Sequence, residues 1–325
     1  MKKSQHTSLF ILMIMTILMS CKSTDRATIV DRSGQLQAKG NRIVDRNGTP
    51  IQLYGMSFFW SQWMGKYYNA ETVSWLKQDW NCTILRAAMG IEGGGYLQNP
   101  AREEQKIITV VDAAIANGLY VIIDWHDHHG ENHLQESKTF FASMAKRYGG
   151  YPNVIYELYN EPLQVSWSKV LKPYHEAVID TIRKYDTKNL IVCGTPNWSQ
   201  WVDSAALDPI KDSNVAYTLH FYAGTHKQEL RDRAKFALDR GIALMVTEYG
   251  TTDANGNGAV DTEETERWFA FMDEYKLSGC NWSVADKNES SAALKPGAAP
   301  SGGWSEDMIN PSGLLVRSKH KRQKQ

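Results

Sequence analysis

The sequence has few cysteines and no excess of charge of either sign, and these shortages exclude several classes of protein. Only four of its 325 residues are cysteine, and Cys82, Cys193 and Cys280 remain once position 21 is set apart. An odd number of cysteines in separate apolar runs is a poor disulfide framework, so we interpret them as small buried hydrophobic residues. Basic and acidic residues both number 36, giving zero formal net charge. No polyanion-binding face is implied, and we expect no nucleic-acid partner.

The chain also lacks an internal linker. No stretch rich in proline, glycine or serine interrupts it, so we expect one domain without an appended binding module. A length of 325 residues is enough for one large core. The 11 tryptophans and 15 tyrosines suit a well-filled core as well as a sugar-stacking cleft, so aromatic content does not separate the two.

The first twenty residues predict a targeting segment rather than part of the fold. Lys2 and Lys3 form a basic start, and the apolar run from Leu9 to Met19 is too short to span a membrane as a stable helix. The run closes on Leu18-Met19-Ser20-Cys21, which resembles the lipobox of bacterial lipoproteins. We therefore expect residues 1–20 to be a lipoprotein-type signal peptide and Cys21 to anchor an exported protein to the bacterial outer membrane. A secreted or periplasmic protein is the alternative.

Between its ends the chain alternates strand-like and helix-like segments. Residues 21–39 are polar and predict a linker, and residues 317–325 predict a basic, solvated tail. Eight apolar strands are expected at 51–58, 83–88, 119–125, 154–161, 190–194, 215–221, 243–250 and 280–284. Helices are expected at 70–80, 103–117, 134–148, 167–185, 200–207, 227–239 and 263–277, and after Pro311. Eight strand-then-helix units over residues 40–316 predict an α/β fold, a single-domain (β/α)8 TIM barrel.

Polar side chains gather where these strands end. The fourth strand closes on Asn160 and Glu161 before Pro162, and the seventh carries Glu248. Carboxyl ends of barrel strands face one common mouth, and two carboxylates there are the equipment of acid–base or covalent glycosyl chemistry. A simple ion pair with arginine would explain either glutamate alone. It does not explain the further polar and aromatic set expected at the same mouth: Arg86, His126, His220, Tyr222 and Trp282.

Six segments in chain order carry a family resemblance. They are 84–89 (ILRAAM), 124–126 (DWH), 156–162 (YELYNEP), 219–222 (LHFY), 246–250 (VTEYG) and 281–283 (NWS). Together they resemble glycoside hydrolase family 5, the retaining (β/α)8 cellulases with catalytic glutamates on strands four and seven. The run 286–294 (DKNESSAAL) further resembles the subfamily 2 endo-β-1,4-glucanases. The resemblance implies double-displacement hydrolysis of internal bonds in cellulose-like β-glucans, with no required cofactor.

The resemblance also implies roles for individual residues. Glu161 would be the general acid and then the base, and Glu248 would be the nucleophile, kept ionised by Arg86 and Tyr222, with the two carboxyl groups ~5 Å apart. We expect Glu161 to hold a proton near neutral pH because the charge of Glu248 favours it. Asn160 would donate to the sugar 2-hydroxyl. The remaining members would bind hydroxyls, orient the carboxylates or stack on sugars: His126, His220, Trp282, Lys287 and Glu289.

One departure concerns the first strand. Many relatives place a histidine after Gly55-Met56-Ser57, whereas this chain has Phe58-Phe59-Trp60. Trp60 or Trp63 instead supplies a distal aromatic platform in our interpretation.

Other functions remain open at this point. Asp253, Asn255, Asn257 and Glu264 fit the EF-hand loop pattern, although the loop follows a strand rather than a helix, so calcium stays an alternative. The run 126–129 (HDHH) suggests a zinc hydrolase, which leaves both glutamates unexplained. A β-mannanase, a mixed-linkage glucanase and a non-catalytic glycan-binding lipoprotein are further alternatives. We expect the protein to be a monomer.

Overall fold

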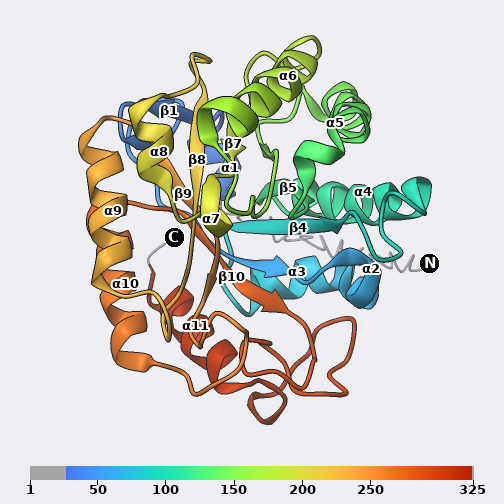
Figure 1. Ribbon diagram of the computed structural model, residues 1–325. Helices are drawn as coiled ribbons and strands as arrows, with labels where there is room; N and C mark the ends of the chain where they lie inside the picture. Colours follow the sequence, from blue (N-terminus) through green and yellow to red (C-terminus); the bar gives the residue numbers. More distant parts are fainter. Residues whose placement is uncertain (1–26, 324–325) are drawn as a thin grey trace, which may run out of the picture.

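Eight parallel strands close into a barrel in the computed structural model, which describes residues 27–323 (Figure 1). Each strand pairs with the next in chain order, and the last pairs with the first to close the sheet. The strands are β3 Tyr54–Phe58, β4 Ile84–Gly90, β5 Tyr120–His126, β6 Val154–Glu157, β7 Ile191–Cys193, β8 Val215–Tyr222, β9 Leu244–Gly250 and β10 Gly279–Val284. The predicted single-domain (β/α)8 barrel is confirmed.

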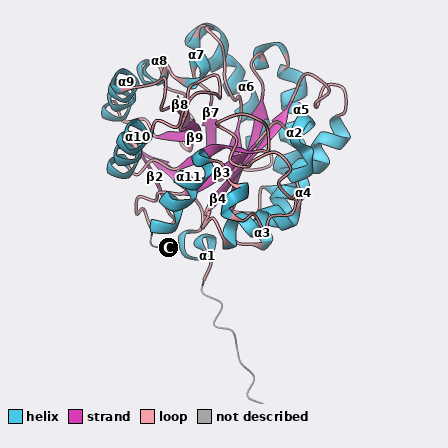
Figure 2. Cartoon of the chain, turned by 90° about the horizontal axis from the view of Figure 1, so that it is seen from below, coloured by secondary structure: helices cyan, strands magenta, loops and turns pink. Residues whose placement is uncertain are grey.

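Helices surround the barrel on the outside (Figure 2). Asn69 caps α3 as expected, its side chain accepting a hydrogen bond from the backbone of Thr72. The α-helices are α1 Ile29–Ser33, α2 Ser61–Met64, α3 Ala70–Gln78, α4 Pro100–Ala116, α5 Leu134–Tyr148, α6 Lys172–Arg183, α7 Pro196–Ser199, α8 Val202–Leu207, α9 Gln228–Asp239, α10 Thr262–Tyr275 and α11 Pro311–Arg322. Shorter turns are the 3-10 segments Gly65–Tyr67, Gly130–Asn132 and Glu306–Met308 and the π-helix Trp167–Leu171. Within residues 27–323, no helix combines the length and apolar character needed to cross a membrane.

Alternation along the strands decides which side chains reach the barrel interior. In β4, Leu85 and Met89 pack in the large cluster between sheet and helices, whereas Ile84 packs in the cluster inside the amino-terminal end of the barrel. Residues two apart in a strand share a face, so Arg86 points inward above Ile84. By the same rule, Asp124 points inward above Ile122 in β5. The polar side chains of Arg86 and Asp124 therefore lie inside the barrel, nearer its carboxyl end than Ile84 and Ile122.

The predicted linker, residues 21–39, is wrong from residue 27 onward. Residues Ile29–Ser33 form α1, and β1 Gln37–Lys39 pairs antiparallel with β2 Arg42–Val44. Val30 and Leu36 pack with the inward residues at the amino-terminal end of the barrel, so this segment closes that end. These elements are too short to show a hydrophobic period, so they could not be predicted from the sequence. Residues 21–26 and the expected signal peptide, 1–20, lie outside the described residues.

The predicted solvated tail, residues 317–325, is also wrong for most of its length. Helix α11 continues to Arg322, and Lys319 and His320 are buried. Arg317 forms two hydrogen bonds of 2.8 Å to Asp79, and Lys319 lies 2.5 Å from Asp273. Specific carboxylates on neighbouring elements therefore hold a segment whose composition suggested a free end.

Candidate active site

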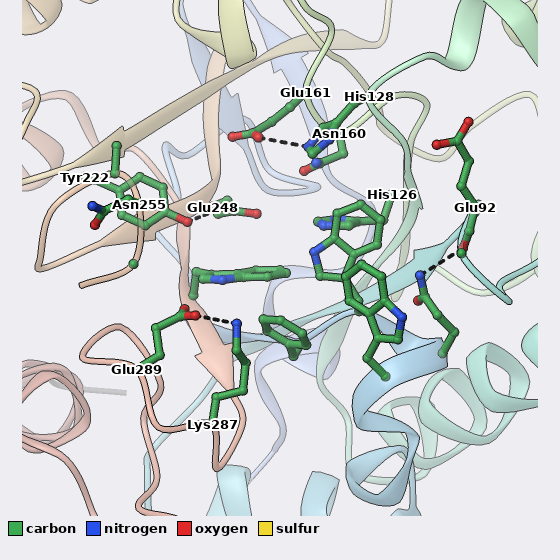
Figure 3. A pocket seen from close by; sticks show the side chains of 18 residues that line it. Glu92, His126, His128, Asn160, Glu161, Tyr222, Glu248, Asn255, Lys287 and Glu289 are labelled. Carbon is green, nitrogen blue, oxygen red and sulfur yellow. Dashed lines mark hydrogen bonds and ion pairs between the residues drawn. The ribbon is translucent and has the colours of Figure 1, made fainter.

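The carboxyl ends of the strands surround two cavities that meet at Glu161 and Tyr222. The first has a volume of about 520 Å³ and also contains Glu248, Trp60 and Trp282 (Figure 3). The second, of about 500 Å³, lies on the other side of Glu161 and contains His220 and Trp198. Together they form a cleft that extends to both sides of Glu161.

Glu161 and Glu248 face each other in this cleft. A carboxylate oxygen of each and a ring nitrogen of His220 all lie within 4.8 Å of one another. Retaining glycosidases hold their two carboxyl groups ≈ 5–5.5 Å apart, whereas inverting enzymes need ≈ 6.5–9.5 Å. The geometry of this site therefore agrees with the retaining arrangement.

The backbone explains how each glutamate reaches the mouth. Glu161 follows β6, and its N–H donates to the Asp127 carbonyl, which keeps the chain beside the end of β5. Glu248 lies in an irregular part of β9, where Thr218 pairs with Met245 but His220 pairs with Glu248. One extra residue in β9 is thus accommodated by a β-bulge, which re-aims side chains at the end of a strand.

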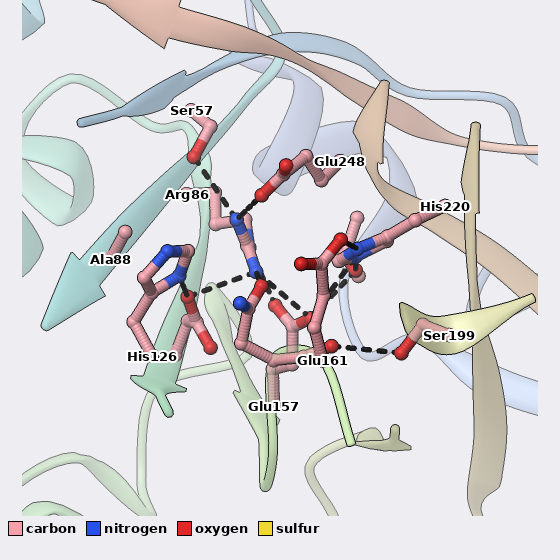
Figure 4. Close-up of polar contacts among 12 residues, drawn as sticks. Ser57, Arg86, Ala88, His126, Glu157, Glu161, Ser199, His220 and Glu248 are labelled. Atoms are coloured by element: carbon pink, nitrogen blue, oxygen red, sulfur yellow. Dashed lines mark hydrogen bonds and ion pairs between the residues drawn. The ribbon is translucent and has the colours of Figure 1, made fainter. Parts of the chain in front are cut away.

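Arg86 connects the carboxylates beneath the cleft (Figure 4). Its fully buried guanidinium lies 2.9 Å from Asp124, 2.7 Å from Glu157 and 2.9 Å from Glu248. It also donates to Oδ1 of Asn160 at 2.6 Å. A planar group with five donors is suited to such a hub, and lysine could not make these contacts together.

Glu248 is held by two donors. Nη1 of Arg86 donates to Oε2 and the hydroxyl of Tyr222 donates to Oε1, at 2.9 and 2.6 Å. Burial and the neighbouring Glu161 raise the pKa of Glu248, while His220, Arg86 and the Tyr222 hydroxyl act against that rise. The two donors therefore support the ionised form and fix the orientation of the carboxylate.

Glu161 is bonded to imidazoles instead. Nδ1 of His220 lies 2.9 Å from Oε1, and Nε2 of His128 lies 3.3 Å from Oε2. Burial alone would raise the pKa of Glu161, but hydrogen bonds from His128 and His220 outweigh it and lower this pKa to about 2. The carboxylates of Glu157 and Glu161 in turn overcome the effect of burial and raise the pKa of His220 to about 9. These shifts favour the carboxylate form of Glu161 and the imidazolium form of His220, so in the free protein the proton expected on Glu161 is favoured at Nδ1 of His220.

Aromatic side chains form one wall of the first cavity. The indole of Trp282 stacks on His126 with ring centroids 5.1 Å apart and planes 4° apart. Trp60 meets His126 edge-on at 4.2 Å. Burial and the nearby Arg86 lower the pKa of His126 well below its usual range, so the ring is neutral at neutral pH. These rings offer the apolar faces on which sugars stack.

The remaining predicted residues also line the first cavity. Oδ1 of Asn160 accepts from Arg86, and its Nδ2 is buried without a hydrogen-bond partner among the described residues. A buried amide donor left free costs energy unless a ligand satisfies it. Lys287 pairs with Glu289, and both face the cavity beside Phe59. The structure thus brings together every residue predicted for the site.

Several side chains at the site were not predicted. Asp124 and Glu157 are acids inside apolar strands, and that pattern could have identified them, since buried charges are almost always paired. His128 was considered only as a zinc ligand, whereas it contacts Glu161. Trp198 is 38% exposed and lines the second cavity. It follows strand β7 and carried no sequence signal that distinguished it from a loop residue.

The predicted calcium loop is not arranged to hold the ion. Glu264 lies in the first turn of α10, and its carboxylate is paired with Arg231 and, at 3.5 Å, with Arg267. The side chain of Asn255 accepts a hydrogen bond from the backbone of Asn257. The EF-hand pattern needs Glu264 as a free carboxylate ligand, so this arrangement gives no support to the calcium alternative at Asp253, Asn255, Asn257 and Glu264.

The zinc alternative finds no support in the geometry of its histidines. Nδ1 of His126 lies 2.7 Å from Asp124, and the ring stacks on Trp282. His128 reaches Glu161 with Nε2. Neighbouring histidines of the run are therefore bonded to different carboxylates rather than directed at one point.

Comparisons with known proteins agree with this geometry. Residues 44–288 match the model of the family described as Cellulase (glycosyl hydrolase family 5). The chain belongs to glycosyl hydrolase family 5. Endoglucanase Z of Dickeya dadantii is 54% identical to it over 266 residues, which are 80% of this chain and 62% of that protein. An endoglucanase of Clostridium saccharobutylicum is 43% identical over 94% of this chain and 69% of its own length. This family 5 chain thus spans about two thirds of the length of these relatives.

Solved structures give the same result for the fold. The catalytic domain of endoglucanase Cel5A from Thermobifida fusca superimposes with a TM-score of 0.87 at 36% identity, covering 90% of this chain and 99% of that one. A structure from Cytophaga hutchinsonii gives a TM-score of 0.90 at 57% identity, covering 90% and 96%. The family 5 resemblance predicted from the six sequence segments is confirmed.

Proposed function

We propose that this family 5 protein is a retaining endo-β-1,4-glucanase that hydrolyses internal bonds of cellulose-like β-glucans by double displacement. The observation that carries the proposal is the facing pair Glu161 and Glu248, within 4.8 Å, with one held by fixed donors and the other by imidazoles. Relatives named endoglucanase, at 43–54% identity, support the substrate class. The cleft extends past both sides of Glu161, which suits a polymer cut internally.

In the first step Glu248 attacks the anomeric carbon and Glu161 protonates the departing glycosidic oxygen. The carboxylate of Glu248 is oriented by Arg86 and Tyr222, so little reorganisation is needed as its charge is lost to the new bond. The proton passes from Nδ1 of His220 to Glu161 and on to the leaving oxygen. The glycosidic bond breaks, and a covalent glycosyl–Glu248 ester remains.

In the second step water replaces the departed chain. Glu161, now a carboxylate, takes a proton from the water. The water oxygen attacks the anomeric carbon and expels Glu248. The configuration at the anomeric carbon is retained because each step inverts it. The free Nδ2 of Asn160 is placed to donate to the sugar 2-hydroxyl, a bond that strengthens as charge develops at the sugar.

The other cleft residues position the chain of sugars. Trp282, with His126 stacked on it, offers a ring face below the sugar that precedes the cut, and Trp60 extends this wall. Lys287 and Glu289 provide hydrogen bonds further toward the non-reducing end. No step requires a cofactor.

The proposal is tested by an activity panel of purified protein on carboxymethyl-cellulose, barley glucan and mannan. We expect reducing ends to be released fastest from the soluble β-1,4-glucan, and faster release from barley glucan or mannan would instead favour a mixed-linkage glucanase or a β-mannanase. Glu161→Gln and Glu248→Gln should each lower kcat by several orders of magnitude. Glu274→Gln, at an exposed position of α10, is the matched control and should retain full activity. Wild-type protein that binds β-glucan without releasing reducing ends would identify a glycan-binding protein instead.

We further propose that the protein is an exported monomer anchored through a lipid at Cys21, in the bacterial outer membrane. The support is the apolar run that ends in Leu18-Met19-Ser20-Cys21, a segment outside the described residues. Incorporation of labelled palmitate into the wild type but not into Cys21→Ser tests the anchor, and size-exclusion chromatography with light scattering tests the oligomeric state.

A further inference from the structure

A line of hydrogen bonds leads from Glu161 down into the barrel (Figure 4). Nδ1 of His220 lies 2.9 Å from Oε1 of Glu161, and Nε2 of the same ring lies 2.9 Å from Oγ1 of Thr247. Oγ1 of Thr247 lies 2.6 Å from Oε1 of Glu157. His220, Thr247 and Glu157 are at most 1% exposed, so these groups depend on one another for hydrogen bonds.

The charge state of Glu157 decides which atom donates and which accepts in each of these hydrogen bonds. Nε and Nη2 of Arg86 donate to the two oxygens of Glu157, at 2.7 and 3.2 Å. Burial opposes the charge on Glu157, but Arg86 and His220 lower its pKa, so the group is a carboxylate and can only accept. Thr247 has one hydroxyl hydrogen and must donate it to Glu157. Its oxygen is then an acceptor, and Nε2 of His220 must carry a hydrogen.

We infer that Thr247 is a positioning residue that fixes His220 in the form protonated at Nε2, so that Nδ1 of His220 and Glu161 share one proton. The inference rests on the proposed role of Glu161 as acid and base. When His220 is neutral, Nδ1 presents a lone pair, and its bond to Glu161 exists only if Glu161 is protonated. When Nδ1 is protonated, His220 is a cation and Glu161 a carboxylate. Both states contain the proton that the leaving oxygen needs.

Loss of that proton is unfavourable in this arrangement. It would leave the Nδ1 lone pair facing a carboxylate oxygen 2.9 Å away. An imidazole without Thr247 would carry its remaining hydrogen on Nδ1 and donate it to Glu161. In this protein that form would lose the hydrogen bond from Nε2 of His220 to Oγ1 of Thr247. The hydroxyl of Thr247 therefore keeps the shared proton in place to higher pH.

The other charged groups around His220 act in both directions, because Glu157 and Glu248 are anions whereas the buried Arg86 that pairs with both is a cation. Glu157 and Glu248 favour the imidazolium, and burial opposes it. Glu157 lies 3.8 Å from Nε2, too far for a direct hydrogen bond, so the hydroxyl of Thr247 is needed to connect the two. Burial lowers the pKa of His126 and of His226, so neither adds positive charge near neutral pH, whereas Glu161 raises the pKa of His128, which lies 3.3 Å from Oε2 of Glu161. The form of the ring is thus decided by Thr247.

Two substitutions separate the hydroxyl from the methyl group. Thr247→Val removes the hydroxyl and keeps a branched side chain, whereas Thr247→Ser keeps the hydroxyl and removes the methyl. In Thr247→Val the deprotonated pair can adopt the Nδ1–H form, so the alkaline limb of kcat/KM on soluble β-glucan should move to lower pH by about one unit. Thr247→Ser should keep the wild-type limb. An unmoved limb in an active Thr247→Val protein, or an equal shift in Thr247→Ser, would overturn the inference.

A measurement on the wild type needs neither activity nor a variant. Nitrogen-15 NMR of the histidine rings in the unliganded protein, followed above the pKa of His220, reports which nitrogen keeps its hydrogen. We expect the hydrogen of His220 on Nε2, and a hydrogen on Nδ1 would refute the inference even if the protein hydrolyses glucan. A wild type that cleaves no β-glucan but keeps the Nε2 hydrogen would refute the proposed function while supporting the role of Thr247.

Discussion

Replacing Tyr222 by phenylalanine removes one of the two donors that hold Glu248. The hydroxyl lies 2.6 Å from Oε1, and burial beside Glu248 raises the pKa of Tyr222 well above its usual range, so the hydroxyl remains a donor throughout the working pH range. A hydrogen bond to a charged group contributes ~1.5–3 kcal/mol. At 1.36 kcal/mol per pH unit, its loss should raise the pKa of Glu248 by about 1–2.

The assay is the pH dependence of kcat/KM, whose acidic limb reports ionisation of the nucleophile in the free enzyme. We expect that limb to move about 1–2 pH units upward in Tyr222→Phe, so that activity below the limb falls by roughly ten- to a hundredfold. Tyr249→Phe is the matched control, because Tyr249 adjoins Glu248 in β9 but stacks on Phe221 in the cluster outside the sheet. An unmoved limb in Tyr222→Phe, or the same shift in Tyr249→Phe, would refute the assignment of Glu248 as a nucleophile stabilised by Tyr222.

Three further predictions concern the cleft, the His220–Glu161 pair and the amino-terminal segment. Trp198→Ala should raise KM for long cello-oligosaccharides several-fold with little change in kcat, measured by steady-state kinetics, because the indole lines the second cavity away from the reacting carbon. Around the His220–Glu161 pair, Glu157 and Glu161 raise the pKa of His220 from 6.5 to about 9, and hydrogen bonds from His128 and His220 lower that of Glu161 from 4.5 to about 2. The stabilisation by the pair is therefore full between pH 4.5 and 6.5 and is lost as pH rises through 9 or falls through 2, so the difference in urea midpoint between wild type and Glu161→Gln should narrow toward pH 9. Leu36→Ala should lower the free energy of unfolding by ~2–4 kcal/mol in urea titrations, whereas a solvated linker residue would cost almost nothing.

The regular elements could be predicted because the period of apolar residues is a local property of the sequence. Helix α5 was expected at 134–148 and is observed at Leu134–Tyr148. Strand β6 was expected to continue to 161 but ends at Glu157, after which single backbone bonds hold Asn160 and Glu161 beside β5. Side-chain pattern alone does not show where a strand ladder ends, since that depends on the neighbouring strand.

The segment at 27–39 and the end of α11 were missed for a different reason. Their stability comes from partners far away in the sequence, such as Gly34, whose carbonyl accepts from Tyr120, and Asp79, which binds Arg317. Composition described both segments correctly as polar. Polar segments still order when their donors and acceptors find fixed partners, and those partners are not visible within a short window of sequence.

The protonation states of the side chains at the mouth of the barrel could not be predicted from the sequence for a related reason. Placing Glu161, Glu248 and His220 at strand ends follows from the barrel, but which nitrogen meets which oxygen follows from the bulge in β9 and the course of the chain after β6. Those details give the two glutamates different partners. Glu248 is bound by a guanidinium and a phenol that keep their protons over the working range, whereas Glu161 is bound by imidazoles that can exchange theirs. A nucleophile needs a constant charge and an acid–base group needs a mobile proton, so the partners, more than the two identical carboxyl groups, assign the roles.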